Sequence, residues 1–229
     1  MKSIIVTGAS GNLGKAVVAK FLSSGFKVIG IYGLNDKILP DEAGINSKSA
    51  RLDLRDEAAS EAFIDNVIDK EKMIDVAVLT VGGFEMGDIS STSSADIKNQ
   101  YQLNFETTYN IARPIFKQML KQGSGRIFLT GARPGLDSKF AKGMVGYSLS
   151  KSLIFRLAEI MNEESAGKDV VTSVIVPSVI DTPQNRKSMP DSDPDTWIKP
   201  ESIAELIFLY CTPKAGLIRQ PVIKIYGNV

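Results

Sequence analysis

The chain has 229 residues, of which 43% are hydrophobic, and this length and composition suit one compact domain spanning residues 1–229. Its 27 Lys and Arg nearly balance 26 Asp and Glu, which argues against a nucleic-acid partner because such proteins carry a clustered basic excess. With no His and a single cysteine, Cys211, the chain can form neither an intrachain disulfide nor a cysteine-rich zinc site, and we expect no metal.

The N-terminus carries an apolar run of only three residues, 4–6, before Thr7 and Gly8. A secretory signal needs a longer apolar region followed by a small-residue cleavage site. No stretch of the sequence reaches the ~18–20 apolar residues of a membrane span. The sequence therefore predicts a cytoplasmic protein with no membrane partner.

Short apolar runs rich in β-branched residues recur along the chain. Because these runs lack polar alternation, they are typical of strands that are buried on both faces of a parallel sheet. The predicted strands cover residues 4–6, 28–31, 76–79, 126–129, 170–176 and 222–225, with a more weakly marked strand at 50–52.

Apolar side chains between these runs recur at helical spacing, at Leu13, Val17 and Phe21 and again at Ala59, Phe63 and Val67. Ser93 with Asp96 resembles a capping box, which predicts a helix that opens there and runs past Asn104. Pro200 suits the first turn of a late helix. This alternation predicts an α/β fold, a single-domain doubly wound (Rossmann-type) parallel sheet with helices on both faces.

One irregular segment, residues 181–200, is rich in Pro, Ser and Asp and directly follows a predicted strand. A substrate-covering loop is expected at this place in the architecture. Arg186 and Lys187 either bind substrate there or are solvated loop charges, and the solvated state is the commoner one for such residues. Trp197 either closes over the substrate or anchors the loop.

A glycine-rich turn, residues 7–14, connects the first strand to the first helix. Glycines at such a junction let the backbone turn tightly and approach a pyrophosphate, which the N-terminus of the following helix stabilises. The alternative is a purely structural turn. The candidate cofactor contacts are Gly8, Ser10, Gly11, Asn12, Leu13 and Gly14.

Tyr147 and Lys151 are four residues apart and therefore share one helix face. A free Tyr has a pKa near ~10, and a neighbouring ammonium that stabilises the phenolate is expected to lower it, which would make Tyr147 a usable acid and base. The buried side of this helix is expected to consist of Leu153, Ile154, Leu157, Ile160 and Met161.

The glycine turn and the Tyr147-Lys151 pair, at this separation, resemble the short-chain dehydrogenase/reductase family over essentially the whole chain. The resemblance implies NAD or NADP as cofactor, a small-molecule substrate and a homo-oligomer, either a dimer or a tetramer. In the spacing of its glycines the turn is similar to atypical members of the family. The residue after the second strand, Tyr32, is neither a carboxylate for an NAD ribose nor an Arg for an NADP phosphate, so the cofactor preference stays open.

The same resemblance implies roles for residues elsewhere in the chain. Asn104 matches the family's Asn, which holds a water beside the lysine, so Tyr147, Lys151 and Asn104 are the expected catalytic residues. Plain surface placement on a helix is the alternative for Asn104. Further cofactor contacts are implied at Tyr32, Asp53, Leu54, Val81, Gly82, Gly83, Tyr147, Lys151, Pro177, Val179 and Thr182.

Two positions depart from the common pattern of the family. Thr80-Val81-Gly82-Gly83 replaces its usual Asn-Asn-Ala-Gly, and Ala132 stands where the family's catalytic Ser is expected. That Ser donates a hydrogen bond to the substrate carbonyl, and the loss of such a donor costs on the order of 10²–10³ in turnover. Either Ser138 or Thr130 takes its place, or the substrate is easier to reduce.

Three segments together resemble dihydropteridine reductases: Gly131-Ala132, residues 143–147 and residues 181–190. The substrate of that family, a quinonoid dihydropterin, accepts hydride readily. An NAD(P)H-dependent reductase of a quinonoid dihydropterin is therefore the expected function. A carbonyl or 3-oxoacyl reductase of the same family and a non-catalytic dinucleotide-sensing module are the alternatives.

Overall fold

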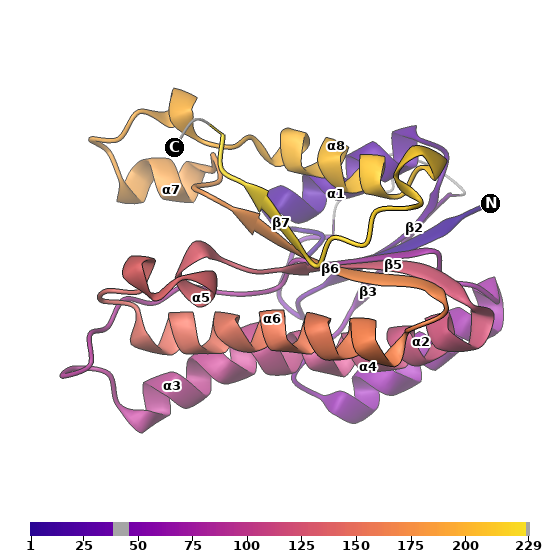
Figure 1. Cartoon of the computed structure of the whole chain (residues 1–229), viewed down its shortest axis with the longest axis horizontal. Coiled ribbons are helices and arrows are strands. Elements are labelled where there is room, and N and C mark those ends of the chain that lie inside the picture. The colour runs from indigo at the N-terminus through magenta and orange to yellow at the C-terminus, as the bar shows by residue number, and fades with distance from the viewer. Residues whose placement is uncertain (39–45, 228–229) are drawn as a thin grey trace.

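Parallel strands form the centre of the molecule in the order β3-β2-β1-β4-β5-β6-β7 (Figure 1). The computed structural model describes residues 1–38 and 46–227. The strands are β1 (Ser3–Thr7), β2 (Lys27–Tyr32), β3 (Ser47–Arg51), β4 (Val76–Leu79), β5 (Ser124–Thr130), β6 (Asp169–Pro177) and β7 (Val222–Ile225). All seven predicted strands are present, and most extend beyond the predicted range by one or a few residues.

The middle of the sheet is mostly apolar because it has a helical layer on each face. Ile5 of β1 lies opposite Ile29 of β2 and Ala77 of β4, and all three are buried. The strand order reverses between β1 and β4, which sends successive helices to opposite faces. In sheets of this kind the carboxyl ends of the strands at the reversal open into a crevice that binds ligands.

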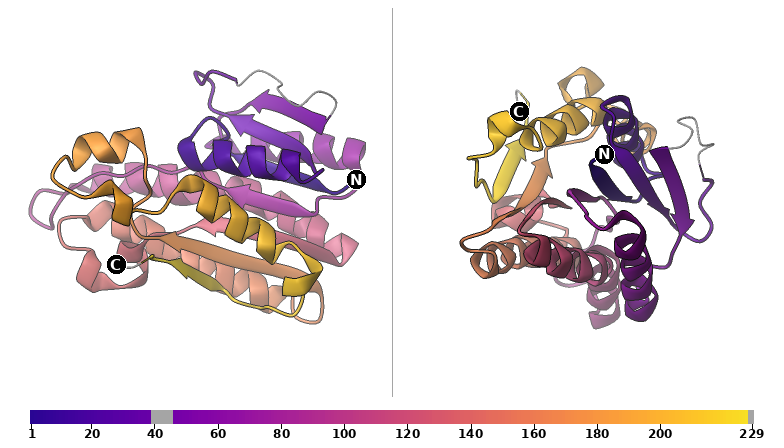
Figure 2. Two further views of the ribbon diagram at one scale, coloured as in Figure 1. Left: turned by 90° about the horizontal axis from the view of Figure 1, so that it is seen from above. Right: turned by 90° about the vertical axis from the view of Figure 1, so that its right-hand side faces the viewer.

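Helices cover both faces of the sheet (Figures 1 and 2). One face carries α1 (Asn12–Ser23) and α8 (Pro200–Tyr210), and the other carries α2 (Glu57–Glu71), α4 (Thr107–Gln122) and α6 (Val145–Glu164). Each layer has its own apolar core, centred on Phe21 and Ile207 on the first face and on Ile111 and Ile154 on the second. The doubly wound α/β fold is confirmed.

The predicted capping box is present at the start of α3 (Ser94–Tyr101), where Ser93 and Asp96 bond reciprocally. The helix runs on through a π-helical turn, η2 (Gln102–Glu106), into α4. A π-turn frees backbone carbonyls, and two threonine hydroxyls satisfy them: Thr107 donates to the Leu103 carbonyl at 2.7 Å and Thr108 to that of Asn104 at 3.0 Å. The local sequence thus supports the bulge that carries Asn104.

The expected buried side of α6 is only partly correct. Ile154 and Met161 are buried, whereas Leu153 is 38% and Ile160 is 48% exposed. Only one face of α6 packs against the sheet, so apolar residues on its outer side remain at the surface of the described chain. Periodicity alone does not separate these two faces when both carry apolar residues.

The segment that follows β6 has its two ends joined to each other. Ile180 and Ile198 form a parallel bridge, and between them lie α7 (Pro183–Ser188) and η4 (Pro194–Thr196). Trp197 is half-buried at the end of this segment.

Within the described ranges, 1–38 and 46–227, no helix combines the length and the apolar character needed to cross a bilayer.

Candidate active site

The glycine turn between β1 and α1 is too tight for a larger residue. A Cβ atom at Gly14 would lie 2.1 Å from the Gly8 carbonyl oxygen, so the helix can approach the turn this closely only without a side chain there. Gly11 precedes α1 with no capping side chain among the described residues. The first N–H groups of α1, from Asn12 and Leu13 onward, therefore face the turn and fit the pyrophosphate of a dinucleotide.

The turn is joined to the end of β4 by two hydrogen bonds. The Thr80 hydroxyl donates to the Thr7 carbonyl at 2.7 Å, and the Thr80 N–H donates to the Thr7 hydroxyl at 3.1 Å. Thr80, which replaces the usual Asn after β4, thus holds the two central strands together at the crevice. Val81 follows it and lines the crevice beside Gly8.

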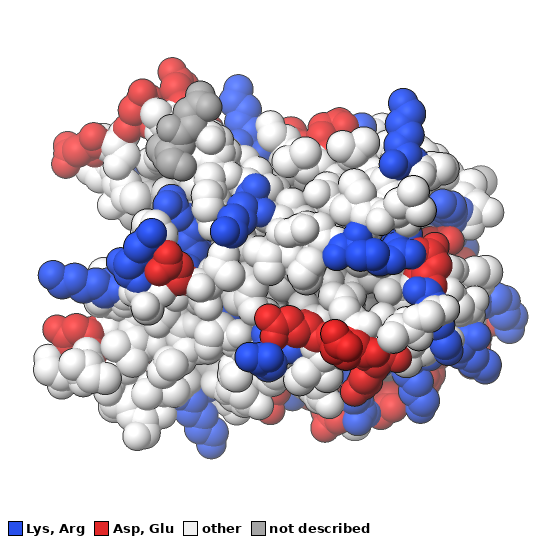
Figure 3. Space-filling view, in the orientation of Figure 1, with Lys and Arg blue, Asp and Glu red and all other residues white. Residues whose placement is uncertain are grey.

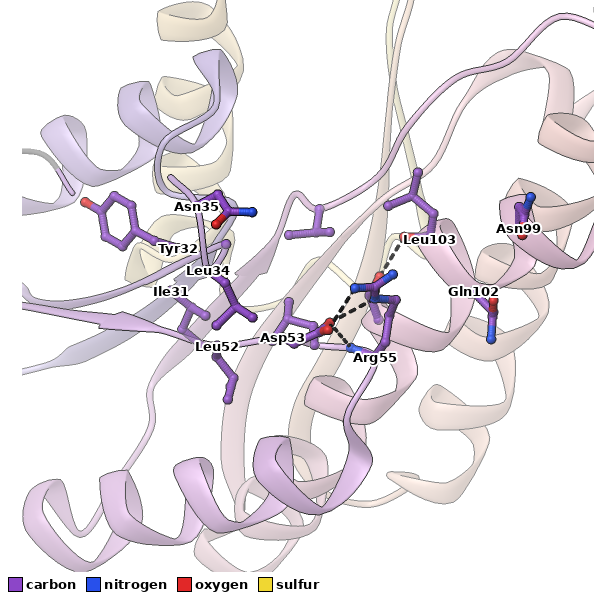
Figure 4. A pocket seen from close by; sticks show the side chains of 14 residues that line it. Ile31, Tyr32, Leu34, Asn35, Leu52, Asp53, Arg55, Asn99, Gln102 and Leu103 are labelled. Carbon is purple, nitrogen blue, oxygen red and sulfur yellow. Dashed lines mark hydrogen bonds and ion pairs between the residues drawn. The ribbon is translucent and has the colours of Figure 1, made fainter. Parts of the chain in front are cut away.

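A groove of about 470 Å³ extends from this crevice over the carboxyl ends of β2 and β3 (Figure 4). Asp53, Leu54 and Val81, three of the predicted cofactor contacts, line it. Asp53 accepts two hydrogen bonds from the Arg55 guanidinium, at 3.0 and 2.8 Å, which lowers the pKa of this carboxyl. Leu54 is almost fully buried beneath the groove. The cofactor contacts that the resemblance implies along this groove stay predictions.

Tyr32 lies at this groove, but its ring is not directed into it. The ring points away from Asp53 in Figure 4 and packs within 3.0 Å of the position that a Cβ would take at Gly30. A carboxylate reaches the glycine turn instead. Asp36 accepts hydrogen bonds from the Ser10 hydroxyl and from the Gly33 N–H, and both lower its pKa. Asp36 thus places beside the glycine turn the carboxylate that Tyr32 does not supply.

Tyr147 and Lys151 lie on one face of α6, below the end of β5. Lys151 is 4% exposed, and its ammonium donates to the Thr130 carbonyl at 2.8 Å. A Cβ at Gly82 would lie 3.1 Å from Lys151 Nζ and 2.7 Å from Asn104 Oδ1, so these two groups approach each other across a glycine. The segment after β4 therefore needs Gly82 in order to pass over them.

Burial dominates the titration of both α6 side chains. It raises the pKa of Tyr147 to about 12 and lowers the pKa of Lys151 to about 8. The lowered tyrosine pKa expected from the sequence is therefore wrong, because loss of water around the phenol raises it. At neutral pH Tyr147 is protonated and Lys151 is charged, which suits proton donation to a substrate.

Asn104 is fully buried in the π-turn and is not on the helix surface. Its Oδ1 accepts from the Gly83 N–H at 3.0 Å, and its Nδ2 donates to Gln100 at 3.0 Å and to the Ser150 hydroxyl at 3.2 Å. Asn104 therefore fastens the segment after β4 to both α3 and α6. The catalytic role that the resemblance implies for it stays a prediction.

Of the two hydroxyls considered as a replacement for the missing Ser, one is already engaged in the sheet and the other is at the surface. Thr130 already donates to the Leu79 carbonyl at 2.9 Å, within the sheet. Ser138 is exposed on the short helix η3 (Ser138–Phe140). Ala132 itself is buried at the start of α5 (Arg133–Leu136).

The residues predicted to flank the nicotinamide lie at the end of β6. Pro177 is its last residue, and Val179 accepts from the Ile198 N–H at 2.9 Å. Thr182 caps α7 by accepting from the Asn185 N–H at 3.1 Å. Arg186 makes a two-point ion pair with Asp181, at 2.7 and 2.8 Å, so its charge is matched within the loop.

Two features near the site were not singled out from the sequence. Phe84 is 58% exposed and packs perpendicular to Tyr147, with ring centroids 5.0 Å apart. Arg133 is held between the rings of Phe140 and Tyr226, at 4.1 and 4.6 Å. Lys and Arg side chains, with some Asp and Glu among them, lie at the surface around α7 and α5 (Figure 3). An aromatic residue directly after Gly82-Gly83 is the sequence signal that could have indicated Phe84.

Comparison with known proteins agrees with this geometry. The family model described as short chain dehydrogenase matches residues 2–193. Dihydropteridine reductase of Dictyostelium discoideum is 29% identical over 214 residues, which cover 92% of this chain and 88% of that protein. Acetoacetyl-CoA reductase of an Acinetobacter species is 27% identical over 189 residues, covering 80% of this chain and 75% of that protein.

A solved structure supports the fold alone. It is that of a Burkholderia xenovorans protein described as a short-chain dehydrogenase/reductase, which superposes with a TM-score of 0.84 at 22% identity, over 99% of this chain and 95% of the other. The family model covers well over half of the residues and includes the glycine turn and the Tyr147-Lys151 pair. The chain therefore belongs to the short-chain dehydrogenase family and is an NAD(P)-dependent oxidoreductase.

Proposed function

We propose that this enzyme reduces a quinonoid dihydropterin. The observation that carries the proposal is the lack of a free hydroxyl at the position of Ala132, with Thr130 engaged in the sheet. A ketone needs such a donor to polarise its carbonyl, whereas an electron-poor quinonoid ring does not depend on it to the same degree. Similarity to a dihydropteridine reductase over 92% of the chain supports the same substrate.

The chain's own residues would orient the reactants and supply the proton. A bound nicotinamide supplies a hydride, and the glycine turn with the groove over β2 and β3 would hold the adenosine end of that cofactor. Tyr147, protonated below a pKa of about 12, would donate a proton to the substrate. The charged Lys151 would stabilise the phenolate that results, and Asn104 would hold the segment after β4 in place.

The direct test is oxidation of NADH and NADPH in the presence of quinonoid dihydrobiopterin, compared with an acetoacetyl thioester. We expect rapid turnover of the pterin and slow turnover of the thioester. An Ala132→Ser variant is the matched control, because a restored hydroxyl should speed thioester reduction and leave pterin reduction nearly unchanged. Rapid thioester turnover by the wild type, without pterin turnover, would support the 3-oxoacyl reductase function instead.

We propose NADH as the preferred cofactor because of Asp36. Its carboxylate accepts from Ser10 in the glycine turn, where an adenosine ribose would lie. A carboxylate can accept from a ribose hydroxyl but repels the 2′-phosphate of NADPH. Arg51, the nearby cation, is engaged with the Asp36 carbonyl at 3.0 Å.

The Asp36→Asn variant is therefore expected to shift the ratio of kcat/KM for NADPH over NADH upward by about tenfold, as removal of roughly 1.4 kcal/mol of charge repulsion would. The measurement is steady-state kinetics with both cofactors. Asp65→Asn, on the exposed side of α2, removes the same charge elsewhere and should leave the ratio unchanged. A ratio that does not respond to Asp36→Asn would refute the assignment.

Two further parts of the proposal concern the outer surface. The segment 181–200, anchored by the Ile180–Ile198 bridge, would cover the substrate.

The protein would also self-associate through α4 and α6, because Tyr109 of α4 and Leu153 and Ile160 of α6 are exposed apolar residues. Sedimentation equilibrium tests the second point, and a monomer at micromolar concentration would contradict it.

A further inference from the structure

The segment that follows Gly82 is held rigidly over the start of α6. Gly83 donates to Asn104, and Gln100 donates to Glu85 at 3.3 Å. Farther along, the Gly87 N–H donates to the Gly143 carbonyl at 2.8 Å, and the Val145 N–H donates to the Gly87 carbonyl at 2.9 Å. These bonds fix the segment to three neighbouring elements, so its side chains are positioned before any ligand arrives.

Phe84 lies in the middle of this fastened segment, beside the proton donor. Its ring centroid is 5.0 Å from that of Tyr147, at an interplanar angle of 85°. Yet 58% of Phe84 is exposed, although an aromatic side chain gains much of its stabilising effect by burial. A large apolar side chain held in place but left open beside a reactive group is typical of a ligand contact.

We infer that Phe84 is a specificity-determining residue on which the flat, conjugated ring of the substrate lies. The inference rests on the proposed function and names the feature of the substrate that the site selects. Perpendicular packing against Tyr147 leaves Phe84 with free aromatic surface next to the hydroxyl that donates the proton. A conjugated ring placed there gains both burial and ring–ring attraction, whereas an acyl chain gains burial alone.

This difference makes a leucine substitution informative. Leucine offers a similar apolar surface to an acyl chain but no aromatic face to a conjugated ring. In Phe84→Leu we therefore expect KM for quinonoid dihydrobiopterin to rise about tenfold, the change that loss of one aromatic contact produces, with kcat reduced less. KM for an acetoacetyl thioester should stay within about twofold of the wild type. Phe84→Tyr keeps the ring and should retain the wild-type KM for the pterin.

The second readout is binding of oxidised biopterin, which does not react, to the enzyme with NADH bound, measured by titration calorimetry. Its Kd should rise about tenfold in Phe84→Leu and stay unchanged in Phe84→Tyr. Ile89→Ala, which truncates a side chain of the same segment that is 84% exposed, is the matched control and should leave both KM and Kd unchanged. Unaltered Kd for NADH shows that each variant is folded.

The possible failures are distinguishable. A wild type that binds biopterin through Phe84 but does not oxidise NADH with quinonoid dihydrobiopterin refutes the proposed substrate and leaves the ring contact standing. Biopterin binding that is undetectable in the wild type, or equal in wild type and Phe84→Leu, overturns the inference whatever the turnover. If KM rises equally for the pterin and for the thioester in Phe84→Leu, the inference is overturned as well, since Phe84 would then contact the substrate without preference for a ring.

Discussion

Replacement of Tyr147 by Phe is expected to lower kcat by about 10²–10⁴-fold, the usual contribution of a positioned general acid. The substitution removes only the hydroxyl. The ring that packs against Phe84 remains, so the site should keep its shape. Because burial holds the Tyr147 pKa at about 12, the wild type carries the donated proton throughout the physiological range, and the variant lacks it at every pH.

The measurement is single-turnover oxidation of NADH with the pterin substrate, together with the Kd for NADH. The Kd for NADH is expected to change by less than about threefold, because the variant loses at most one hydrogen bond to the cofactor. Tyr109→Phe, on the exposed side of α4, is the matched control for loss of a phenol. Full turnover by Tyr147→Phe would remove Tyr147 from the mechanism. If the wild type binds NADH but none of the tested substrates leads to NADH oxidation, the dinucleotide-sensing alternative would be favoured.

The sheet could be predicted from the sequence because its strands are buried on both faces. Such strands leave an uninterrupted apolar run, as in residues 76–79, where prediction and structure coincide. β3 was the least distinct strand because it lies at the edge of the sheet and none of its residues is fully buried. Edge strands meet weaker packing demands, so their sequences carry a weaker pattern.

The placement of candidate site residues was predictable where chain-local geometry decides it. Tyr147 and Lys151 share a helix face at any location in a protein, and the glycine turn directly follows β1. The Ser10–Asp36 and Phe84–Tyr147 contacts could not be predicted, because each joins segments that only the tertiary fold brings together. The burial of Tyr147, which reversed the expected direction of its pKa, is likewise a property of the folded chain.

Lys151→Met is expected to stabilise the protein without ligand while it reduces turnover. Burial lowers the Lys151 pKa from its ordinary value of 10.5 to about 8, so at pH 7 the folded chain holds an ammonium that would be better solvated in the unfolded chain. At roughly 1.4 kcal/mol for each pH unit, this costs about 3 kcal/mol. Methionine keeps the shape and loses the bond to the Thr130 carbonyl, worth about 1 kcal/mol, for a net gain of about 2 kcal/mol.

The sign of the pH dependence follows from the lowered pKa. Between pH 8 and 10.5 the unfolded chain binds a proton at Lys151 that the folded chain has released, so wild-type stability rises with pH across this window. Below pH 8 both states are charged and the full cost remains. The stability advantage of Lys151→Met over the wild type should therefore be complete at pH 7 and be gone by pH 10.5, where loss of the bond to Thr130 leaves the variant about 1 kcal/mol less stable. Urea unfolding of both proteins at the two pH values measures this difference.

Wild-type turnover should change in the opposite direction to stability as pH rises through this same window. Wild-type kcat is expected to fall as pH rises through about 8, because the neutral amine no longer stabilises the Tyr147 phenolate. Lys151→Met should lack this fall and turn over at least about 10²-fold more slowly at pH 7. Lys142→Met, at an exposed position just before α6, is the matched control and should change neither stability nor kcat. A Lys151→Met variant that is both less stable and fully active would contradict the assignment, since the buried charge would then serve the fold and not the reaction.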